Sequence, residues 1–243
     1  MKIEQIKPYG SEGSKRMQVE KMFNNIAHSY DALNHTLSLG VDRVWRRNAI
    51  DHLKPFHPQR ILDVATGTGD FALLAYERLQ PRQIVGCDIS EGMMEVGRKK
   101  VEKAGLCQHI TFQHEDCARL SFDEGEFDAV ISAFALRNFE NIDACMAEMY
   151  RVLRLGGQLS VIDLCTPVGF PMRQLFYLYK KGIMPLIGRI ISHDDLAYTY
   201  LPQSMDAVPQ GEQMQAIITR AGFQKTSYKR LAFGMCILYT GEK

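Results

Sequence analysis

Residues 60–70 read RILDVATGTGD and join a short apolar run to a loop that contains two glycines. The apolar run is long enough for a buried strand. Gly67 and Gly69 follow it, at the point where a backbone must turn sharply and let a ligand come close. Asp70 stands at a helix N-cap position before helix-forming residues over 71–79. The stretch therefore predicts a strand, a nucleotide-type loop, and a helix whose N-terminus faces the ligand.

Outward from this stretch, predicted strands alternate with predicted helices. Connections of ten or more residues favour right-handed crossovers between parallel strands. The pattern thus predicts an α/β fold, doubly wound and mainly parallel, with a closing pair of strands at its C-terminal end. We expect strands over 61–64, 84–88, 110–113, 127–134, 158–164, 223–229 and 233–240, and helices over 71–79, 91–104, 142–153 and 213–221.

Composition limits the classes of protein that fit. The 243 residues are 46% apolar, enough for one large domain and too many for a disordered chain. A formal net charge of +1 provides no overall field that would attract nucleic acid. The six cysteines include no CxxC pair and do not cluster with histidines at metal-ligand spacing. We therefore expect reduced, mostly buried thiols, no metal site and no nucleic-acid partner.

The N-terminus lacks the apolar stretch of a signal peptide, and no run approaches the ~18 apolar residues of a membrane span. A cytoplasmic location is therefore expected. Residues 1–17 are polar without periodicity and are expected to form a loose leader, followed by a single domain over 18–243. Within that domain we expect an N-terminal helical cap over 18–54, which begins with an amphipathic helix. Residues 165–204 form an apolar insertion that either packs as core or lines an apolar substrate channel.

The glycine loop by itself admits two kinds of cofactor. Gly67-x-Gly69-x-x-Ala72 fits the relaxed dinucleotide fingerprint, and Asp88 lies at the end of the next strand, where an acid binds ribose hydroxyls. Dinucleotide folds usually carry apolar residues at the position of Asp63, inside the first strand. A carboxylate there suits a ligand that bears an ammonium and a sulfonium.

A third acid strengthens this interpretation. Asp116 falls just after the third predicted strand, placed to accept from an adenine amino group, with Cys117 beside it. Individually, Asp63, Asp88 and Asp116 also suit structural roles as a cap, a turn residue and an Asx turn. Their joint placement along successive strands favours S-adenosylmethionine, which carries no phosphate and needs only a close approach to the loop.

Several separated motifs resemble those of the ubiquinone/menaquinone C-methyltransferases. They are YDxxNxxxSxGxxRxWR at 30–46, DVAxGTGD at 63–70, LRN at 136–138, MYRVLxxGG at 149–157, and Asp194 with YxYLxxS at 198–204. The resemblance implies a class I methyltransferase fold, with a mainly parallel seven-stranded sheet, an antiparallel C-terminal strand and S-adenosylmethionine as donor. It also implies methylation of a ring carbon of a polyprenylated quinol, demethylmenaquinol to menaquinol, with 2-methoxy-6-polyprenyl-1,4-benzoquinol as a second acceptor.

The resemblance also carries residue roles to this chain. Thr68, Asp88, Asp116 and Cys117 would contact the cofactor, although the family often has Asn-Ala where this chain has Asp116-Cys117. It also often has Ser where Ala133 stands. Together with the loop residues, the expected cofactor-binding set is Asp63, Gly67, Thr68, Gly69, Asp88, Asp116, Cys117 and Ala133.

Carbon methylation requires a ring activated by loss of a hydroxyl proton, so the site must position the ring, assist deprotonation and exclude water. Arg137 is the expected oxyanion stabiliser, since a guanidinium stays protonated, and Asn138 would orient the same group. Asp31 and Tyr198 are candidate bases. Asp70, His193 and Asp194 are further candidates in regions expected to face the cofactor.

The apolar insertion and the N-terminal helix would enclose the prenyl tail. That arrangement implies a cytoplasmic enzyme that meets its substrate at the inner face of the membrane. Three alternatives remain open. They are a small-molecule O- or N-methyltransferase of the same fold, a dinucleotide-dependent oxidoreductase, and a protein that binds the ligand without turnover. The oligomeric state is not predicted.

Overall fold

A computed structural model describes residues 3–10, 12–38, 40–183 and 195–243, with the side chains of these ranges except at 35, 37, 183 and 195–199. Its centre is a seven-stranded sheet in the order β3-β2-β1-β4-β5-β7-β6. The first five strands pair in parallel, whereas β7 lies antiparallel between β5 and β6. This arrangement confirms the expected fold class. The strands are β1 (Arg60–Val64), β2 (Gln83–Asp88), β3 (Ile110–His114), β4 (Phe127–Ala133), β5 (Leu153–Leu164), β6 (Gln224–Leu231) and β7 (Cys236–Glu242).

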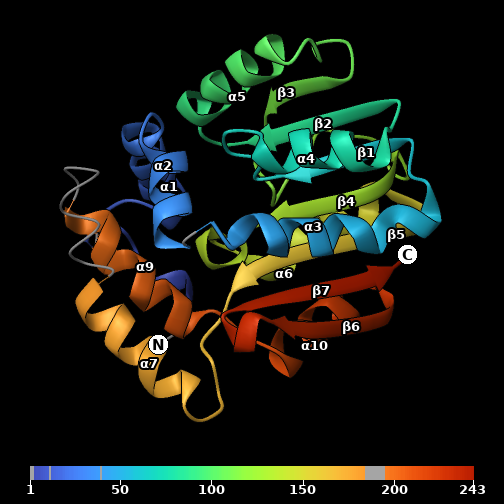
Figure 1. The fold of residues 1–243 in the computed structure, drawn as a ribbon. Helices are drawn as coiled ribbons and strands as arrows, with labels where there is room; N and C mark the ends of the chain where they lie inside the picture. The colour runs from blue at the N-terminus through green and yellow to red at the C-terminus, as the bar shows by residue number, and fades with distance from the viewer. Residues whose placement is uncertain (1–2, 11, 39, 184–194) are drawn as a thin grey trace.

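Helices cover both faces of the sheet, as right-handed crossovers between parallel strands require (Figure 1). One face packs against α3 (Asp42–Leu53), α4 (Asp70–Leu79) and α5 (Glu91–Lys103). The other packs against α6 (Ile142–Val152) and α10 (Glu212–Arg220). The apolar side chains of the central strands β1, β2 and β4 are buried on both faces, which explains why these strands read as nearly continuous apolar runs.

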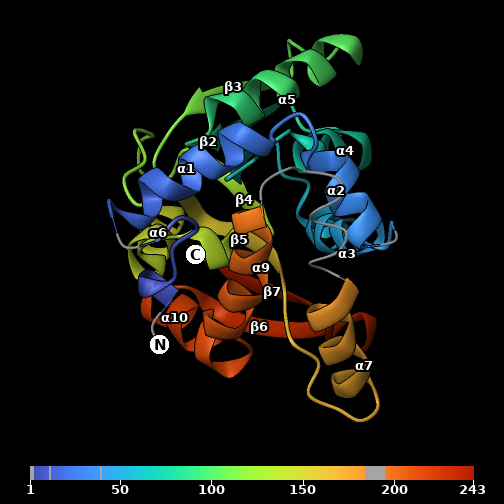
Figure 2. The same ribbon diagram turned by 90° about the vertical axis from the view of Figure 1, so that its left-hand side faces the viewer.

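A cap of helices lies beyond the carboxyl ends of the parallel strands. Figure 2 shows α1, α2 and α9 in front of these strand ends, with α7 beside them. The cap helices are α1 (Lys15–Ile26), α2 (Tyr30–Leu37), α7 (Met172–Leu178) with the π-helical turn η4 (Tyr179–Ile183), and α9 (Asp195–Ala207). In open α/β sheets, ligands bind at this edge. Within the described part of the chain, no helix has the length and apolarity needed to cross a bilayer.

Residues 30–37 and 42–46 lie in regular helices, α2 and α3, although their sequence shows no simple period. The buried positions of α3 recur at helical spacing, but they include Asp42 and Arg46 together with Trp45. Because two of the buried positions carry charged side chains, the apolar residues of α3 do not recur at regular helical spacing. The spacing of apolar residues therefore does not predict this helix.

The N-terminal residues differ from the loose leader that we expected. Ile3 and Ile6 are buried, and α1 begins at Lys15, where the Ser14 hydroxyl accepts a hydrogen bond from the backbone N–H of Met17. The Lys15 side chain is fully buried. A buried lysine cannot be recognised from a polar, aperiodic sequence, because its burial depends on acceptors that distant segments provide.

All six cysteines are free thiols, as expected. Four of them are buried, Cys117 is half-buried, and Cys107 is exposed.

Candidate active site

The glycine loop connects β1 to α4 and is held by the end of β2. Gly67 and Gly69 have φ angles of 57° and 76°, in the left-handed region that favours glycine. A Cβ at Gly69 would lie 2.9 Å from Cζ of Phe112, so the helix that follows can pack closely only without a side chain. The backbone N–H of Gly67 donates to Oδ2 of Asp88 at 2.8 Å. This hydrogen bond holds the glycine loop against the carboxyl end of β2.

Asp88 faces the cleft beside this loop. Its Oδ1 accepts from the backbone N–H of Ser90 at 2.8 Å, and its side chain lines the cleft with Gly67 and Ile89. Burial raises the pKa of Asp88, opposed by its backbone donors. The free lone pairs of this carboxyl are placed for hydroxyl donors such as those of a ribose.

Asp63 lies beneath the loop and does not line the cleft directly. It is 1% exposed, and its Oδ2 accepts from the Thr66 hydroxyl at 2.7 Å. Its Oδ1 has no hydrogen-bond donor among the described residues. Burial raises the pKa of Asp63 to about 7. A buried carboxyl with an unused acceptor is costly by itself, and a ligand ammonium would satisfy it.

A polar network joins the loop to the cap. The Thr68 hydroxyl donates to Oδ1 of Asp31 at 2.6 Å, and Nζ of Lys100 lies 2.5 Å from Oδ2 of Asp31. The same Nζ lies 2.6 Å from Oδ1 of Asp70. Both oxygens of Asp31 are thus engaged, and α2 is tied to α4 and α5.

Of the expected adenine-side residues, Cys117 and Ala133 line the cleft. Asp116 does not; its Oδ1 accepts from the backbone N–H of Ala118 at 2.9 Å, and its Oδ2 lies 3.2 Å from Nε of Arg16. Sγ of Cys117 lies 2.8 Å from Sγ of Cys145, and this hydrogen bond together with burial raises the pKa of the Cys117 thiol.

Helix α1 closes the outer side of this cleft through Val19 and Phe23, with Tyr30 of α2 beside them. The space inside is about 70 Å³, smaller than the roughly 300–1,000 Å³ of typical ligand pockets. The apolar walls, the glycine loop and the unused acceptor of Asp63 fit S-adenosylmethionine.

A second space, an apolar cavity of about 280 Å³, lies between α3, α7, α9 and the ends of β4 and β5. Phe134 lines both this cavity and the cofactor cleft. A smaller pocket bridges the two, because it shares Tyr30 and Asn138 with the cleft and Asn34 and Arg137 with the cavity. The three spaces therefore adjoin one another, and the turn Leu136–Asn138 lies among them, with Asn138 at the cleft and Arg137 at the cavity.

Phe134 occupies the shared wall in a strained conformation. Its φ is 63°, which is unusual for a bulky residue and costs of order 1–3 kcal/mol. Its backbone N–H donates to the carbonyl of Ile162 at 2.8 Å, and its carbonyl accepts from Nη1 of Arg137 at 2.5 Å. No sequence signal marks this position, because the strain exists only in the folded chain.

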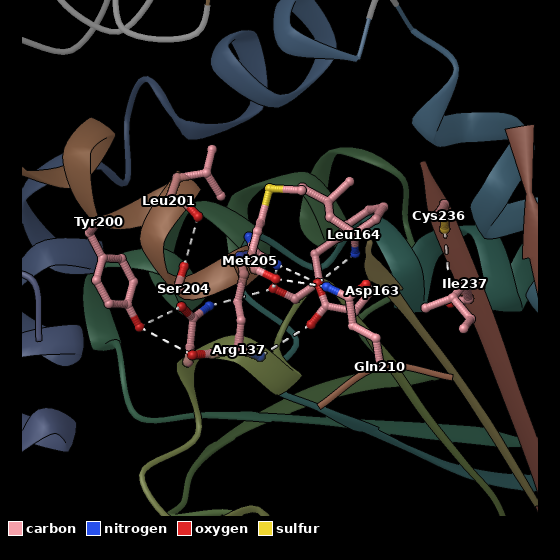
Figure 3. Close-up of polar contacts among 12 residues, drawn as sticks. Arg137, Asp163, Leu164, Tyr200, Leu201, Ser204, Met205, Gln210, Cys236 and Ile237 are labelled. Atoms are coloured by element: carbon pink, nitrogen blue, oxygen red, sulfur yellow. Dashed lines mark hydrogen bonds and ion pairs between the residues drawn. The ribbon is translucent and has the colours of Figure 1, made fainter. Parts of the chain in front are cut away.

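Arg137 lies in the 3₁₀ turn η3 (Leu136–Asn138) and is 6% exposed. Its Nη1 lies 2.6 Å from Oδ1 of Asp163, at the end of β5, and its backbone N–H donates to Oδ2 of Asp163 at 3.2 Å (Figure 3). Its Nε and Nη2 donate to none of the described residues. Asp163 is not among the residues predicted from the sequence, although it is an acid at a strand end, as Asp88 is.

Two further side chains hold this turn. The hydroxyl of Tyr200 lies 3.3 Å from the carbonyl of Arg137 and 3.2 Å from Oδ1 of Asn138 (Figure 3). Burial raises the pKa of Tyr200, so the hydroxyl remains a donor. Nζ of Lys15 donates to the same carbonyl from the other side. Among the predicted bases, the side chain of Tyr198 and the residues His193 and Asp194 lie outside the described residues.

Comparison with known proteins agrees with this geometry. Two curated relatives are named demethylmenaquinone methyltransferase. The protein of Bacteroides fragilis is 57% identical to this chain, and the match covers 99% of this chain and 98% of the relative. The protein of Porphyromonas gingivalis is 45% identical, and the match again covers 99% of this chain and 98% of the relative. A SAM-dependent methyltransferase structure from Thermotoga maritima shares the fold, with a TM-score of 0.60, 16% identity, and coverage of 92% of this chain and 99% of that one. The model of the ubiE/COQ5 methyltransferase family matches residues 11–243, and this chain belongs to that family.

Proposed function

We propose that this chain transfers a methyl group from S-adenosylmethionine to a ring carbon of a polyprenylated quinol, with demethylmenaquinol as the acceptor. The family and the names of its relatives support methylation in quinone biosynthesis. The single observation that carries the proposal is that the three spaces adjoin. The cleft suited to S-adenosylmethionine and the apolar cavity share Phe134, and the smaller pocket between them is lined by the buried Arg137.

In this proposal the cofactor-binding residues act through distinct groups. Gly67 allows the ligand to approach the backbone, whereas Gly69 allows the start of α4 to pack against Phe112. Asp88 accepts from the ribose hydroxyls, and Asp63 lies beneath the amino-acid end of the ligand. Thr68 holds the loop against α2 by its hydrogen bond to Asp31. The engaged oxygens of Asp31 suit this positioning role better than that of a base.

On the adenine side, Cys117 and Ala133 contact the cofactor directly because they line the cleft. Asp116 would hold the turn that carries Cys117, through its bonds to Ala118 and Arg16.

The bound cofactor supplies an electrophilic methyl group on a sulfonium. Arg137 faces the quinol at the junction, and its Nε and Nη2 donors would stabilise the charge that develops on the ring oxygen. Asp163 holds the guanidinium of Arg137 through Nη1. Because the negative charge of Asp163 balances the positive charge of Arg137, the guanidinium is not an unpaired charge in the cavity. Asn138 would orient the same oxygen.

The proposed reaction balances as a substitution. The hydroxyl group loses its proton, and the adjacent ring carbon bonds to the methyl carbon as the carbon–sulfur bond breaks. The proton on that ring carbon then leaves, and the oxygen is reprotonated. One proton is released overall, and the product is the methylated quinol. Phe134 and the apolar walls exclude water from the junction.

An acceptor screen tests the proposal. The protein is incubated with S-adenosylmethionine and a short-chain demethylmenaquinol kept reduced, and in parallel with a benzoquinol, a catechol and an amine. We expect a product that is one methyl group heavier, with the new carbon on the ring. Methylation confined to oxygen or nitrogen, or binding of NADH in place of S-adenosylmethionine, would favour the corresponding alternative function.

We further propose that α7 and its flanking loop contact an anionic membrane surface. An apolar patch, made of Val168, Phe170, Leu175, Leu178 and Phe233, has side chains that are 54–86% exposed. Arg173 and Lys181 are exposed on the same segment. Leu175 also lines the apolar cavity, so the patch continues into the proposed prenyl site.

Sedimentation with vesicles tests this contact. We expect the protein to sediment with vesicles of anionic phospholipid and to remain in solution after Phe170→Ser and Leu178→Ser are combined. Leu155→Ser is the matched control, since Leu155 is 80% exposed outside the patch. Equal sedimentation of the patch variant and the control, or none by the unaltered protein, would contradict the proposal.

A further inference from the structure

The side-chain amide of Asn138 is held at both of its ends. Its Oδ1 accepts from the Tyr200 hydroxyl at 3.2 Å, and its Nδ2 donates to the carbonyl of Phe134 at 3.5 Å. The contact to Phe134 is long for a hydrogen bond, and that carbonyl also accepts from Nη1 of Arg137 at 2.5 Å. Tyr200 therefore provides the stronger of the two contacts that hold the amide.

The Tyr200 hydroxyl has one proton and lies near two acceptors. It is 3.3 Å from the carbonyl oxygen of Arg137 and 3.2 Å from Oδ1 of Asn138 (Figure 3). The carbonyl of Arg137 has a second donor, Nζ of Lys15 at 2.9 Å, whereas Oδ1 of Asn138 accepts from no other described residue. Buried acceptors are normally satisfied. The hydroxyl proton is therefore needed at Asn138, and Tyr200 keeps that proton because burial raises its pKa.

These contacts determine which end of the Asn138 amide faces Phe134. In the reversed orientation Oδ1 would lie opposite the Phe134 carbonyl, and two acceptors would face each other. The observed orientation instead directs Nδ2 of Asn138 and Nη1 of Arg137 to the same carbonyl oxygen. The two donor groups are therefore neighbours, although they belong to different side chains.

Both of these side chains retain donors that the described residues do not use. An amide nitrogen carries two N–H groups, and only one of those of Asn138 has a partner among the described residues. Nε and Nη2 of Arg137 donate to none of them, and neither atom is enclosed by the protein. Asn138, Arg137 and Tyr200 all line the small pocket between the cofactor cleft and the apolar cavity. One acceptor in that pocket can thus receive hydrogen bonds from both side chains.

We propose that Tyr200 is a positioning residue, which fixes the Asn138 amide so that its second N–H and the Arg137 guanidinium donate to the same quinolate oxygen. This inference rests on the proposed function, because the oxygen belongs to the proposed acceptor. Donors that are already fixed on a developing oxyanion stabilise the transition state without reorganisation during the reaction. Tyr200 acts through Asn138 and not on the reacting atoms.

A double-variant cycle tests whether Tyr200 acts through Asn138. Tyr200→Phe removes only the hydroxyl, Asn138→Ala removes the amide, and ring methylation of a short-chain demethylmenaquinol is measured. We expect Tyr200→Phe to lower kcat about tenfold and to leave KM for S-adenosylmethionine unchanged. When Asn138→Ala is already present, Tyr200→Phe should have no further effect on kcat.

Tyr239→Phe is the matched control for the loss of a buried hydroxyl. Tyr239 is also a buried tyrosine, and its hydroxyl accepts from the backbone N–H of Gly211 at 2.8 Å. It lines none of the three adjoining spaces. Tyr239→Phe should leave kcat unchanged.

A second measurement does not require turnover. A short-chain prenylated nitronaphthol absorbs visible light as the naphtholate, so an absorbance titration gives the pKa of its hydroxyl group when it is bound. With the demethylated cofactor present, we expect the pKa of the ligand bound to the unaltered protein to lie below that of the free ligand. Tyr200→Phe should raise the pKa of the bound ligand by about 1, and Tyr239→Phe should not change it.

The outcomes separate this inference from the proposed function. If the unaltered protein forms no ring-methylated quinol, the proposed function fails. If the ring is methylated but Tyr200→Phe lowers kcat by the same factor with and without Asn138→Ala, Tyr200 only supports packing and the inference is overturned. An unchanged kcat, or an unchanged pKa of the bound nitronaphthol, in Tyr200→Phe would overturn it as well.

Discussion

Nζ of Lys15 lies 2.9 Å from the carbonyl oxygen of Arg137, across 122 residues of sequence. The same ammonium donates to the carbonyls of Ile3 and Phe139, each at 3.1 Å. Three acceptors match the three N–H groups of an ammonium. The backbone N–H of Lys15 also donates to Oε1 of Glu140 at 2.8 Å. The first turn of α1, the helix that closes the cofactor cleft, is thereby joined to the turn that carries Arg137.

Replacing this lysine should therefore affect both stability and catalysis. Lys15→Met removes the donor of the Phe139 carbonyl and one of the two donors of the Ile3 and Arg137 carbonyls, which should lower the free energy of unfolding by about 2 kcal/mol. At temperatures where the variant remains folded, we expect kcat to fall further than KM for the quinol rises. Urea unfolding and steady-state kinetics measure the two effects. Lys99→Met, at a 67% exposed side chain, is the control and should change neither. An unchanged kcat in a destabilised Lys15→Met variant would show that the contact is only structural.

Arg137 must be tested together with its partner. Removing Arg137 alone leaves Asp163 buried and unpaired, which costs about 3–5 kcal/mol. Arg137→Met combined with Asp163→Asn avoids the unpaired charge. We expect this double variant to bind S-adenosylmethionine with nearly normal affinity in calorimetry and to lose about 100-fold or more in kcat. Normal turnover would rule out the proposed oxyanion role.

Asp63 should make stability depend on pH. Its pKa is raised by burial from 3.8 to about 7, so between these values the folded protein binds more protons than the unfolded chain. The stability that Asp63 contributes is fully present below pH 4 and is lost as the pH rises through 7. Between pH 4 and pH 8, the free energy of unfolding of the unaltered protein should thus fall relative to that of Asp63→Asn. The expected fall is several kcal/mol, at most roughly 4. Urea unfolding at several pH values measures this. Asp143→Asn, at an exposed ion pair, should follow the unaltered protein.

The same carboxyl predicts a proton linkage in cofactor binding. An ammonium near Asp63 favours the ionised form, so binding of S-adenosylmethionine should release a proton below pH 7, and affinity should rise with pH between 5 and 7. Calorimetry in buffers of different ionisation enthalpy detects the proton. Asp63→Asn should abolish the release, and its persistence in that variant would assign the proton to another group.

The cysteines should differ sharply in reactivity. Cys107 is exposed, whereas the pKa of Cys117 is raised by its hydrogen bond to Cys145 and by burial. Because the thiolate is the reactive form, iodoacetamide at pH 8 should label Cys107 and spare Cys117 until denaturant is added. Peptide mass spectrometry follows both sites. Equal labelling rates in the folded protein would contradict the structure around Cys117.

The sequence by itself determined the sheet, the glycine loop and the acids Asp63 and Asp88. These features follow from local patterns, since a buried strand needs an apolar run and a tight loop needs glycine. Parallel strands have their carboxyl ends at one edge of the sheet. Acids at the ends of successive strands therefore lie near one another at that edge, and this follows from the strand pattern alone. The fold class and the place of the cofactor cleft were therefore predictable.

Only the tertiary structure decided how the reaction centre is held. Lys15 lies in the segment that the sequence predicts as a loose leader, because its local sequence carries no sign of a buried ammonium. Asp163 and Tyr200 join Arg137 from segments distant in the chain. Hydrogen bonds of this kind depend on the three-dimensional position of a partner and leave no period or spacing in the sequence, so they become visible only after packing brings the donors and acceptors together.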